Sequence, residues 1–178
     1  MSDDAMTLMR QANQARRENR LADAHRDFVA AVAHCRQTGK QLELVQSLEG
    51  LGQIERDLGR GDAARPLYEE AVAICREEDD ALTLAHAVRH LGDIHQDAGR
   101  VELAEPCYNE ALAIYRSHKE TSPLDLANAI RPLAILKGRA GEKEEAIRLW
   151  KEAGDLYGAA NVQEGVTESS AQLARLGR

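Results

Sequence analysis

Apolar and small residues recur along this chain with a period of 40 to 42 positions. A fixed period of this length is typical of repeat architectures, in which each unit buries its apolar face against its neighbours. The clearest copies share the recurring positions Leu51-Gly52, Tyr68 and Ala71, then Leu91-Gly92, Tyr108 and Ala111, then Leu133-Ala134, Trp150 and Ala153. A shift of 40 residues toward the N-terminus finds a first copy with Ala12, Phe28 and Ala31.

Within each copy, this spacing predicts two helices that pack against each other. A small residue in the first helix lets the second helix approach closely, and an aromatic residue in the second fills the space between successive pairs. The tail repeats the pattern of a first helix. We therefore expect one domain, residues 1–178, with nine helices: repeats at approximately 3–38, 41–78, 81–118 and 123–158, and a C-terminal capping helix at approximately 160–176.

Local signals support these boundaries. Gly59 and Gly99 are expected to end first helices in the left-handed conformation, and Asn19 takes the glycine's place in the first copy. Ser122 before Pro123 is typical of a helix start, and Asp62 is a candidate cap for the helix that follows Gly59.

The spacing of small and aromatic residues resembles the tetratricopeptide repeat (TPR). The long period and the pattern Ala64/Pro66/Tyr68, repeated as Ala104/Pro106/Tyr108, resemble the kinesin-light-chain-like subgroup. The resemblance implies an all-α, right-handed superhelical solenoid of antiparallel helix pairs, with about four and a half repeats. It also implies a scaffold for protein–protein interaction that binds a peptide or protein segment in its concave groove.

Composition and charge exclude several other classes of protein. The net charge of −7 disfavours binding to nucleic acid, and apolar runs such as Val29 to Ala33 are far too short to cross a membrane. The N-terminus lacks the pattern of a secretory signal, and three widely spaced cysteines suggest no disulfide framework. We therefore expect a cytoplasmic protein that binds neither nucleic acid nor membrane.

The sequence contains no recognisable catalytic or phosphate-binding motif, so we expect no enzymatic activity and no cofactor. One group of polar residues nevertheless stands out. His86, His90, Asp93 and Asp97 are spaced to form a narrow stripe on one helix face. His86, His90 and Asp93 are weak candidates for a divalent metal, but one helix rarely completes a coordination shell, so no metal site is expected.

The resemblance to TPR proteins places this stripe on the concave groove. Carried through the repeats, it implies a groove that is basic at both ends and acidic and histidine-bearing in the middle. The expected contacts with a protein or peptide partner are Asn13, Arg17, Gln53, Asp57, His86, Arg89, His90, Asp93, Asp97 and Arg131. The positions that would form a carboxylate clamp for a chaperone tail do not carry the required residues, so no such ligand is expected.

Two alternatives stay open at this point. Met6 and Met9 lie in an end repeat that has no predecessor within the repeat pattern, so they suit either an adaptable apolar contact or a self-association edge. The chain would then be a structural module that forms a homodimer through its terminal helices. The other alternative, a small metal-binding protein, depends on the His/Asp stripe.

Overall fold

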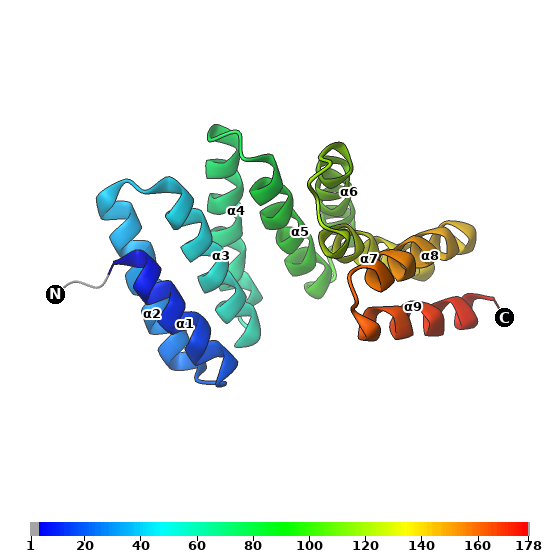
Figure 1. The fold of residues 1–178 in the computed structure, drawn as a ribbon, viewed down its shortest axis with the longest axis horizontal. Coiled ribbons are helices and arrows are strands. Elements are labelled where there is room, and N and C mark those ends of the chain that lie inside the picture. Colours follow the sequence, from blue (N-terminus) through cyan, green and yellow to red (C-terminus); the bar gives the residue numbers. More distant parts are fainter. Residues whose placement is uncertain (1–3, 178) are drawn as a thin grey trace.

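The computed structural model describes residues 4–177, and it confirms the all-α fold (Figure 1). Over this range the chain forms nine helices and no strand. They are α1 (Ala5–Arg17), α2 (Leu21–Thr38), α3 (Gln41–Asp57), α4 (Gly61–Glu77), α5 (Ala81–Asp97), α6 (Val101–Ser117), α7 (Pro123–Arg139), α8 (Lys143–Ala159) and α9 (Gln163–Leu176). Eight of them form four successive pairs, and α9 stands alone at the end.

The helix pairs stack side by side into an elongated solenoid that runs from α1 to α9 (Figure 1). Each helix packs against its neighbours in the chain, and α1 also contacts α3 while α5 contacts α7. The first helices of successive pairs therefore share one face of the solenoid. This arrangement is the helical solenoid that the repeat pattern predicts.

Small and aromatic residues form the contacts within and between pairs, as predicted. At most 2% of the surface is exposed in the four repeat aromatics, Phe28, Tyr68, Tyr108 and Trp150. A Cβ atom on Gly52 would lie 2.6 Å from the Tyr68 ring, and one on Gly92 would lie 2.8 Å from the Tyr108 ring. Because no side chain fits at Gly52 or Gly92, each tyrosine ring packs directly on the backbone of the paired helix.

Residues with a left-handed backbone separate the helices of a pair. Gly59 and Gly99 each have φ of 73°, and Asn19 has φ of 58° at the equivalent place. These values confirm the predicted turns. Asparagine fits there because its short polar side chain tolerates the left-handed region better than most residues.

The two predicted helix caps have different outcomes. The Ser122 hydroxyl accepts a hydrogen bond from the Asp125 N–H at 3.1 Å, so Ser122 caps α7 as expected. The prediction for Asp62 is wrong, because Asp62 lies inside the first turn of α4 and Arg60 occupies the cap position without a side-chain bond. In the first turn the carboxylate still favours the helix through its dipole.

Ion pairs join equivalent positions of successive repeats. Each pair takes its arginine from one repeat and its acidic residue from the next, with N–O distances of 2.6 to 3.2 Å. The second helices carry Arg36–Glu70, Arg76–Glu110 and Arg116–Glu152, and the first helices carry Arg16–Asp57 and Arg56–Asp97. These pairs mark a constant register from one repeat to the next.

The sequence also predicts no disulfide framework and no membrane-spanning segment. Cys35, Cys75 and Cys107 are free thiols. None of the helices within residues 4–177 combines the length and the hydrophobicity that a membrane span requires.

Candidate functional site

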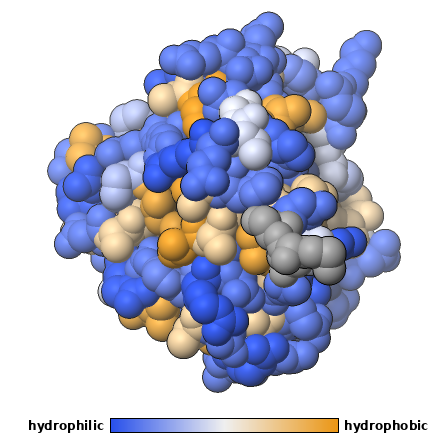
Figure 2. Space-filling view, turned by 90° about the vertical axis from the view of Figure 1, so that its left-hand side faces the viewer, coloured by the Kyte–Doolittle hydropathy of each residue, from blue (hydrophilic) through white to orange (hydrophobic). Residues whose placement is uncertain are grey.

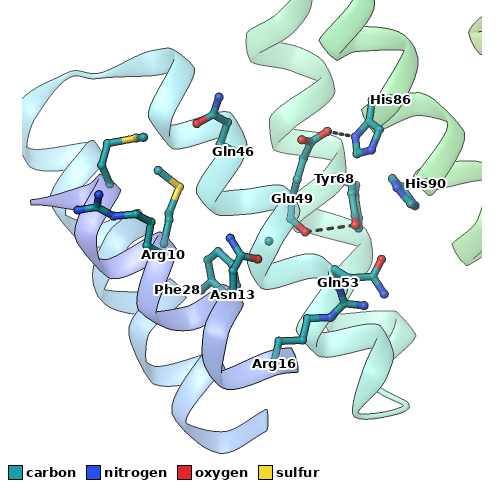
Figure 3. A pocket seen from close by; sticks show the side chains of 13 residues that line it. Arg10, Asn13, Arg16, Phe28, Gln46, Glu49, Gln53, Tyr68, His86 and His90 are labelled. Atoms are coloured by element: carbon teal, nitrogen blue, oxygen red, sulfur yellow. Dashed lines mark hydrogen bonds and ion pairs between the residues drawn. The ribbon is translucent and has the colours of Figure 1, made fainter. Parts of the chain in front are cut away.

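A groove of about 510 Å³ opens on the face that the first helices share (Figure 3). Side chains from α1, α3 and α5 form its walls, and rings from α2 and α4 reach up between them. We call it the N-terminal groove. It is lined by Met6, Met9, Arg10, Asn13, Arg16, Phe28, Gln46, Glu49, Gly50, Gln53, Tyr68, His86 and His90.

The floor of the N-terminal groove is aromatic and apolar. Phe28 packs against the backbone of α3 at Gly50, where a side chain would collide with the ring. The Tyr68 hydroxyl donates to the Glu49 carbonyl oxygen at 3.2 Å, and the His90 ring stacks on Tyr68 with centroids 5.4 Å apart. Rings held in this way form a rigid surface for an apolar side chain of a ligand.

The walls of the groove combine paired and unpaired polar side chains. His86 Nδ1 lies 2.9 Å from the Glu49 carboxylate, and the Arg16 guanidinium donates to Asp57 at 2.6 Å. The only side-chain partner of Arg10 within residues 4–177 is the Thr7 hydroxyl of its own helix, at 3.1 Å. The guanidinium of Arg10 is therefore available to a ligand.

A second cavity, of about 310 Å³, adjoins the N-terminal groove. Gln46, Glu49 and His86 line both hollows, so the two are adjacent. From these shared residues the second cavity extends to the loop between α6 and α7. Its further lining consists of Leu82, Thr83, Tyr115, Glu120, Thr121, Ser122 and Asp125.

A third hollow, of about 210 Å³, lies farther along the first helices, and we call it the C-terminal pocket. Its lining is almost entirely polar: Arg56, Arg89, Asp93, Gln96, Asp97, Asn128, Arg131 and Pro132. Asp93 is at the centre of the network, because it receives hydrogen bonds from the Tyr108 hydroxyl at 3.0 Å and from Arg56 at 3.4 Å. The Nε atoms of Arg56 and Arg89 are buried without a hydrogen-bond partner.

His90 connects the N-terminal groove to this network. Its Nε2 lies 2.9 Å from an Arg89 nitrogen, and its Nδ1 lies 3.1 Å from the Asp93 carboxylate and 3.3 Å from an Arg56 nitrogen. Because the Arg89 nitrogen can only donate and is the closest partner of the ring, Nε2 accepts and Nδ1 donates to Asp93. Burial lowers the pKa of His90 to about 4, and the charge of Arg89 acts in the same direction. The imidazole is therefore neutral at pH 7.

The carboxyl group of Asp93 stays ionised in this network. Burial alone would raise its pKa, but the hydrogen bond from His90 and the positive charges of Arg89 and Arg56 outweigh burial and lower the pKa of Asp93. Asp93 is thus a fixed negative charge between two arginines.

The basic end that the sequence predicts in the fourth repeat is neutralised in the structure. Arg131 donates two hydrogen bonds to the Glu168 carboxylate, at 2.6 and 2.7 Å. Glu168 lies on α9, which packs against α8. The Asn128 side-chain oxygen likewise accepts from the Tyr157 hydroxyl at 3.0 Å.

The ten side chains predicted to contact a partner do not form one site. Asn13, Gln53, His86 and His90 line the N-terminal groove, whereas the C-terminal pocket contains Arg89, Asp93, Asp97 and Arg131. Asp57 borders the groove as the partner of Arg16. Arg17 lies outside both hollows, where it donates to Gln14 of its own helix at 3.2 Å.

Three arginines that line these hollows are not among the predicted contacts, namely Arg10, Arg16 and Arg56. Arg16, rather than Arg17, lines the N-terminal groove because the face that α1 presents also carries Asn13 and Met9, three and seven residues earlier. Arg56 lies 40 positions after Arg16 and makes the equivalent ion pair in the next repeat. That shared repeat position is the signal that could have identified both.

Within residues 4–177, no three His, Cys, Asp or Glu side chains form a group that could hold a metal ion. The geometry of the His/Asp stripe gives the reason. Arg56 and Arg89 lie within 3.6 Å of the Asp93 carboxylate, and His86 is already bonded to Glu49. A cation at Asp93 would meet two guanidinium charges.

Comparisons with known proteins agree with this helical repeat fold. Two family models, both described as tetratricopeptide repeat, match residues 44–78 and 80–158, more than half of the chain. Among solved structures, BtubC (BKLC) from P. vanneervenii has 16% sequence identity and a TM-score of 0.60, over 97% of this chain and 89% of that chain. Its fold is similar, whereas a comparison with curated proteins gave no match. This chain belongs to the tetratricopeptide repeat family.

Proposed function

We propose that this chain is a non-enzymatic scaffold that binds an extended segment of a partner protein in the N-terminal groove. TPR proteins are in general protein-interaction scaffolds. The observation that supports the groove as the binding site is its combination of a fixed aromatic floor with polar walls. Ligand sites in proteins characteristically combine apolar surface with a few polar groups that fix orientation.

The polar walls suit a peptide backbone as well as side chains. Asn13, Gln46 and Gln53 come from two neighbouring helices, and each carries an amide that can both donate and accept a hydrogen bond. An extended peptide has unpaired N–H and C=O groups along its length, and such amides can satisfy them. The proposal therefore involves binding of a segment in its extended form.

Selection from a library of random 12-residue peptides against the full chain tests this proposal. A peptide that crosses three neighbouring helices needs about six to eight residues, given helix spacings of about 9 Å and about 3.3 Å per extended residue. Selected peptides should lose at least about 10-fold in affinity for Gln53→Trp, because the indole fills the groove.

A matched variant carries the same bulky side chain outside the groove. Ala113 is exposed on α6, a second helix, so Ala113→Trp should retain the affinity of the full chain. Fluorescence polarisation of labelled peptides gives both values. If peptides selected on the full chain bind Gln53→Trp as tightly as Ala113→Trp, the N-terminal groove is not the binding site.

Self-association is a second candidate function, and one observation favours it. The N-terminal end of the solenoid shows apolar residues gathered among hydrophilic ones (Figure 2), and Met6 on α1 is 48% exposed. Such a patch suits an apolar contact with a second copy. Light scattering tests this: a concentration-dependent dimer that Met6→Glu disrupts would favour self-association.

The C-terminal end offers a less apolar face. Val88 and Ile130 are buried at equivalent positions of α5 and α7, whereas α9 carries the exposed Ser170 there. A pairing of two C-terminal ends would therefore bury a hydroxyl where the repeat elsewhere buries an apolar side chain. Self-association through the C-terminal end is therefore less favourable than through the N-terminal end.

A further inference from the structure

The N-terminal groove and the adjoining cavity lie next to each other across the first helices, because Gln46, Glu49 and His86 line both. We call the two hollows together the path. One end of this path lies at α1, where Arg10 borders the groove. The other end lies at the loop between α6 and α7. Glu120 and Asp125 line the cavity there.

The two ends carry opposite charges that the fold leaves available. Arg10 forms no ion pair within residues 4–177, and its hydrogen bond is to the neutral Thr7 hydroxyl. At the other end, Asp125 accepts from the neutral Ser122 hydroxyl at 2.6 Å. Glu120 is exposed, and neither carboxylate has a cationic partner in the part of the chain that the structure describes.

The middle of the path differs from both ends, because its one carboxylate, Glu49, is hydrogen-bonded and largely covered. Glu49 is bonded to His86 at 2.9 Å, and its side chain is only 14% exposed. The His86 and His90 rings meet edge to face with centroids 4.6 Å apart, next to the Tyr68 ring. This arrangement offers ring surface rather than free charge in the middle.

We propose that the bound segment has a defined order of charge: an acidic residue that contacts Arg10, an apolar or aromatic residue over the rings, and a basic residue that contacts Glu120 and Asp125. This inference rests on the proposed function, since it specifies the ligand of the same groove. Complementary charges at two ends of one path fix the register of an extended ligand, and a segment of uniform charge would meet a like charge at one end.

The peptides selected from the random library give the first test. Enriched peptides should carry acidic and basic residues on opposite sides of an apolar residue more often than the unselected library does. Enrichment of peptides whose flanking charges all have one sign would overturn the proposed charge order, although the groove would remain the binding site. If no peptide depends on the groove, the proposed function fails, and the charge order fails with it.

Charge reversal at each end gives the second test. Enriched peptides are synthesised with acetylated and amidated ends, and each also in a form with serine in place of its acidic residue. Arg10→Glu should weaken the acidic form about 10-fold and leave the serine form within about 2-fold. Arg17→Glu reverses a charge on the same helix outside the groove, and we expect less than a 2-fold change for either form.

The opposite end is tested in the same way. Glu120→Lys combined with Asp125→Asn should weaken peptides that carry a basic residue about 10-fold, but not their serine forms. Glu102→Lys reverses an exposed charge on α6 and serves as the control. Circular dichroism melts show whether each variant keeps its fold. If the acidic and serine forms respond equally to Arg10→Glu in a folded variant, Arg10 does not contact an acidic residue of the ligand.

Discussion

The N-terminal groove and the C-terminal pocket lie on the same face of one solenoid, yet they use polar side chains in opposite ways. In the groove, the only side-chain partner of Arg10 within residues 4–177 is a neutral hydroxyl on its own helix. In the pocket, Asp93 interacts with Tyr108, Arg56 and His90. The N-terminal groove leaves a charged side chain available to a ligand, whereas charged side chains of the C-terminal pocket bind one another.

The comparison is sharpest at one repeat position, which Asn13 occupies in α1 and Asp93 in α5. Asn13 is exposed, and within residues 4–177 α1 packs against α2 and α3, which lie on one side of it. The Asp93 side chain is 20% exposed and lies between residues of α3 and α6. The place of a repeat in the array therefore decides whether a polar side chain on this face binds a ligand or the protein itself.

The largest effect on stability should follow from removing Tyr108, the aromatic residue that supports the Asp93 network of the C-terminal pocket. Tyr108 is fully buried on Gly92, and its hydroxyl donates to Asp93. Tyr108→Ala should lower the free energy of unfolding by about 3–5 kcal/mol, because it leaves a cavity and a buried carboxylate short of one donor. Urea denaturation measures the loss.

The groove supplies the matched comparison for this change. Asn13→Ala should alter the free energy of unfolding by less than about 0.5 kcal/mol, because Asn13 is exposed and makes no buried contact. A similar loss for both variants would contradict the distinction between the two regions.

The second prediction concerns the pH dependence of stability that buried His90 causes in the Asp93 network. In the unfolded chain His90 has its ordinary pKa of 6.5, and burial lowers that pKa to about 4 in the folded protein. Between these values the unfolded chain binds a proton that folded His90 does not, so stability falls as the pH decreases from 7 to 4. The loss due to His90 should be about 3 kcal/mol.

His90→Gln should remove this part of the pH dependence, whereas His34→Gln, on α2 and away from the network, should retain it. Asp93 contributes little to the comparison, because the glutamine amide can still donate a hydrogen bond to it and because its pKa is lowered from 3.8, so most of its contribution is lost only below that pH. Urea titrations at pH 7 and pH 4 give the values. Parallel pH profiles for the wild type and His90→Gln would show that His90 is not the group responsible.

The third prediction concerns the close helix contact beneath the network. Gly92→Ala should cost about 1–3 kcal/mol, because its Cβ would lie 2.8 Å from the Tyr108 ring, which has no room to move. Gly138→Ala is the matched control in α7. Its Cβ would meet only the Ala146 side chain at 3.8 Å, so the change should stabilise the protein by about 0.5–1 kcal/mol. Thermal melts that show the same sign for both would contradict this account of Gly92.

The sequence predicts the fold well because the repeat encodes its packing locally. The small residue at Gly52 and the ring at Tyr68 recur at fixed spacing, and the structure places each such ring on its glycine. Turn signals at Gly59 and Asn19 are equally local. Asp62 is the exception, because an acidic residue near a helix start serves equally well as a cap or in the first turn.

The candidate site is harder to predict because it depends on which side chains bind each other across repeats. Spacing places Arg131 on the groove face, but it cannot show that Glu168, 37 residues later, neutralises it. Spacing alone also cannot decide between Arg16 and Arg17, because both lie near the edge of the same helix face. The prediction names Arg17, whereas Arg16 lines the groove. Only the three-dimensional structure shows which charged side chains are paired within the protein and which are available to a ligand.

The smallest effect should appear on the ion pairs between second helices. Arg76 and Glu110 are 2.8 Å apart, but their side chains are 56% and 40% exposed, so water screens the pair. A double-mutant cycle with Arg76→Ala and Glu110→Ala should give a coupling energy of at most about 0.5 kcal/mol. The same cycle on Arg56 and Asp93, whose side chains are each 20% exposed, should give about 1 kcal/mol or more. A coupling as strong for the exposed pair would mean that the second-helix pairs hold the repeats in register, and would remove the contrast between buried and exposed charge.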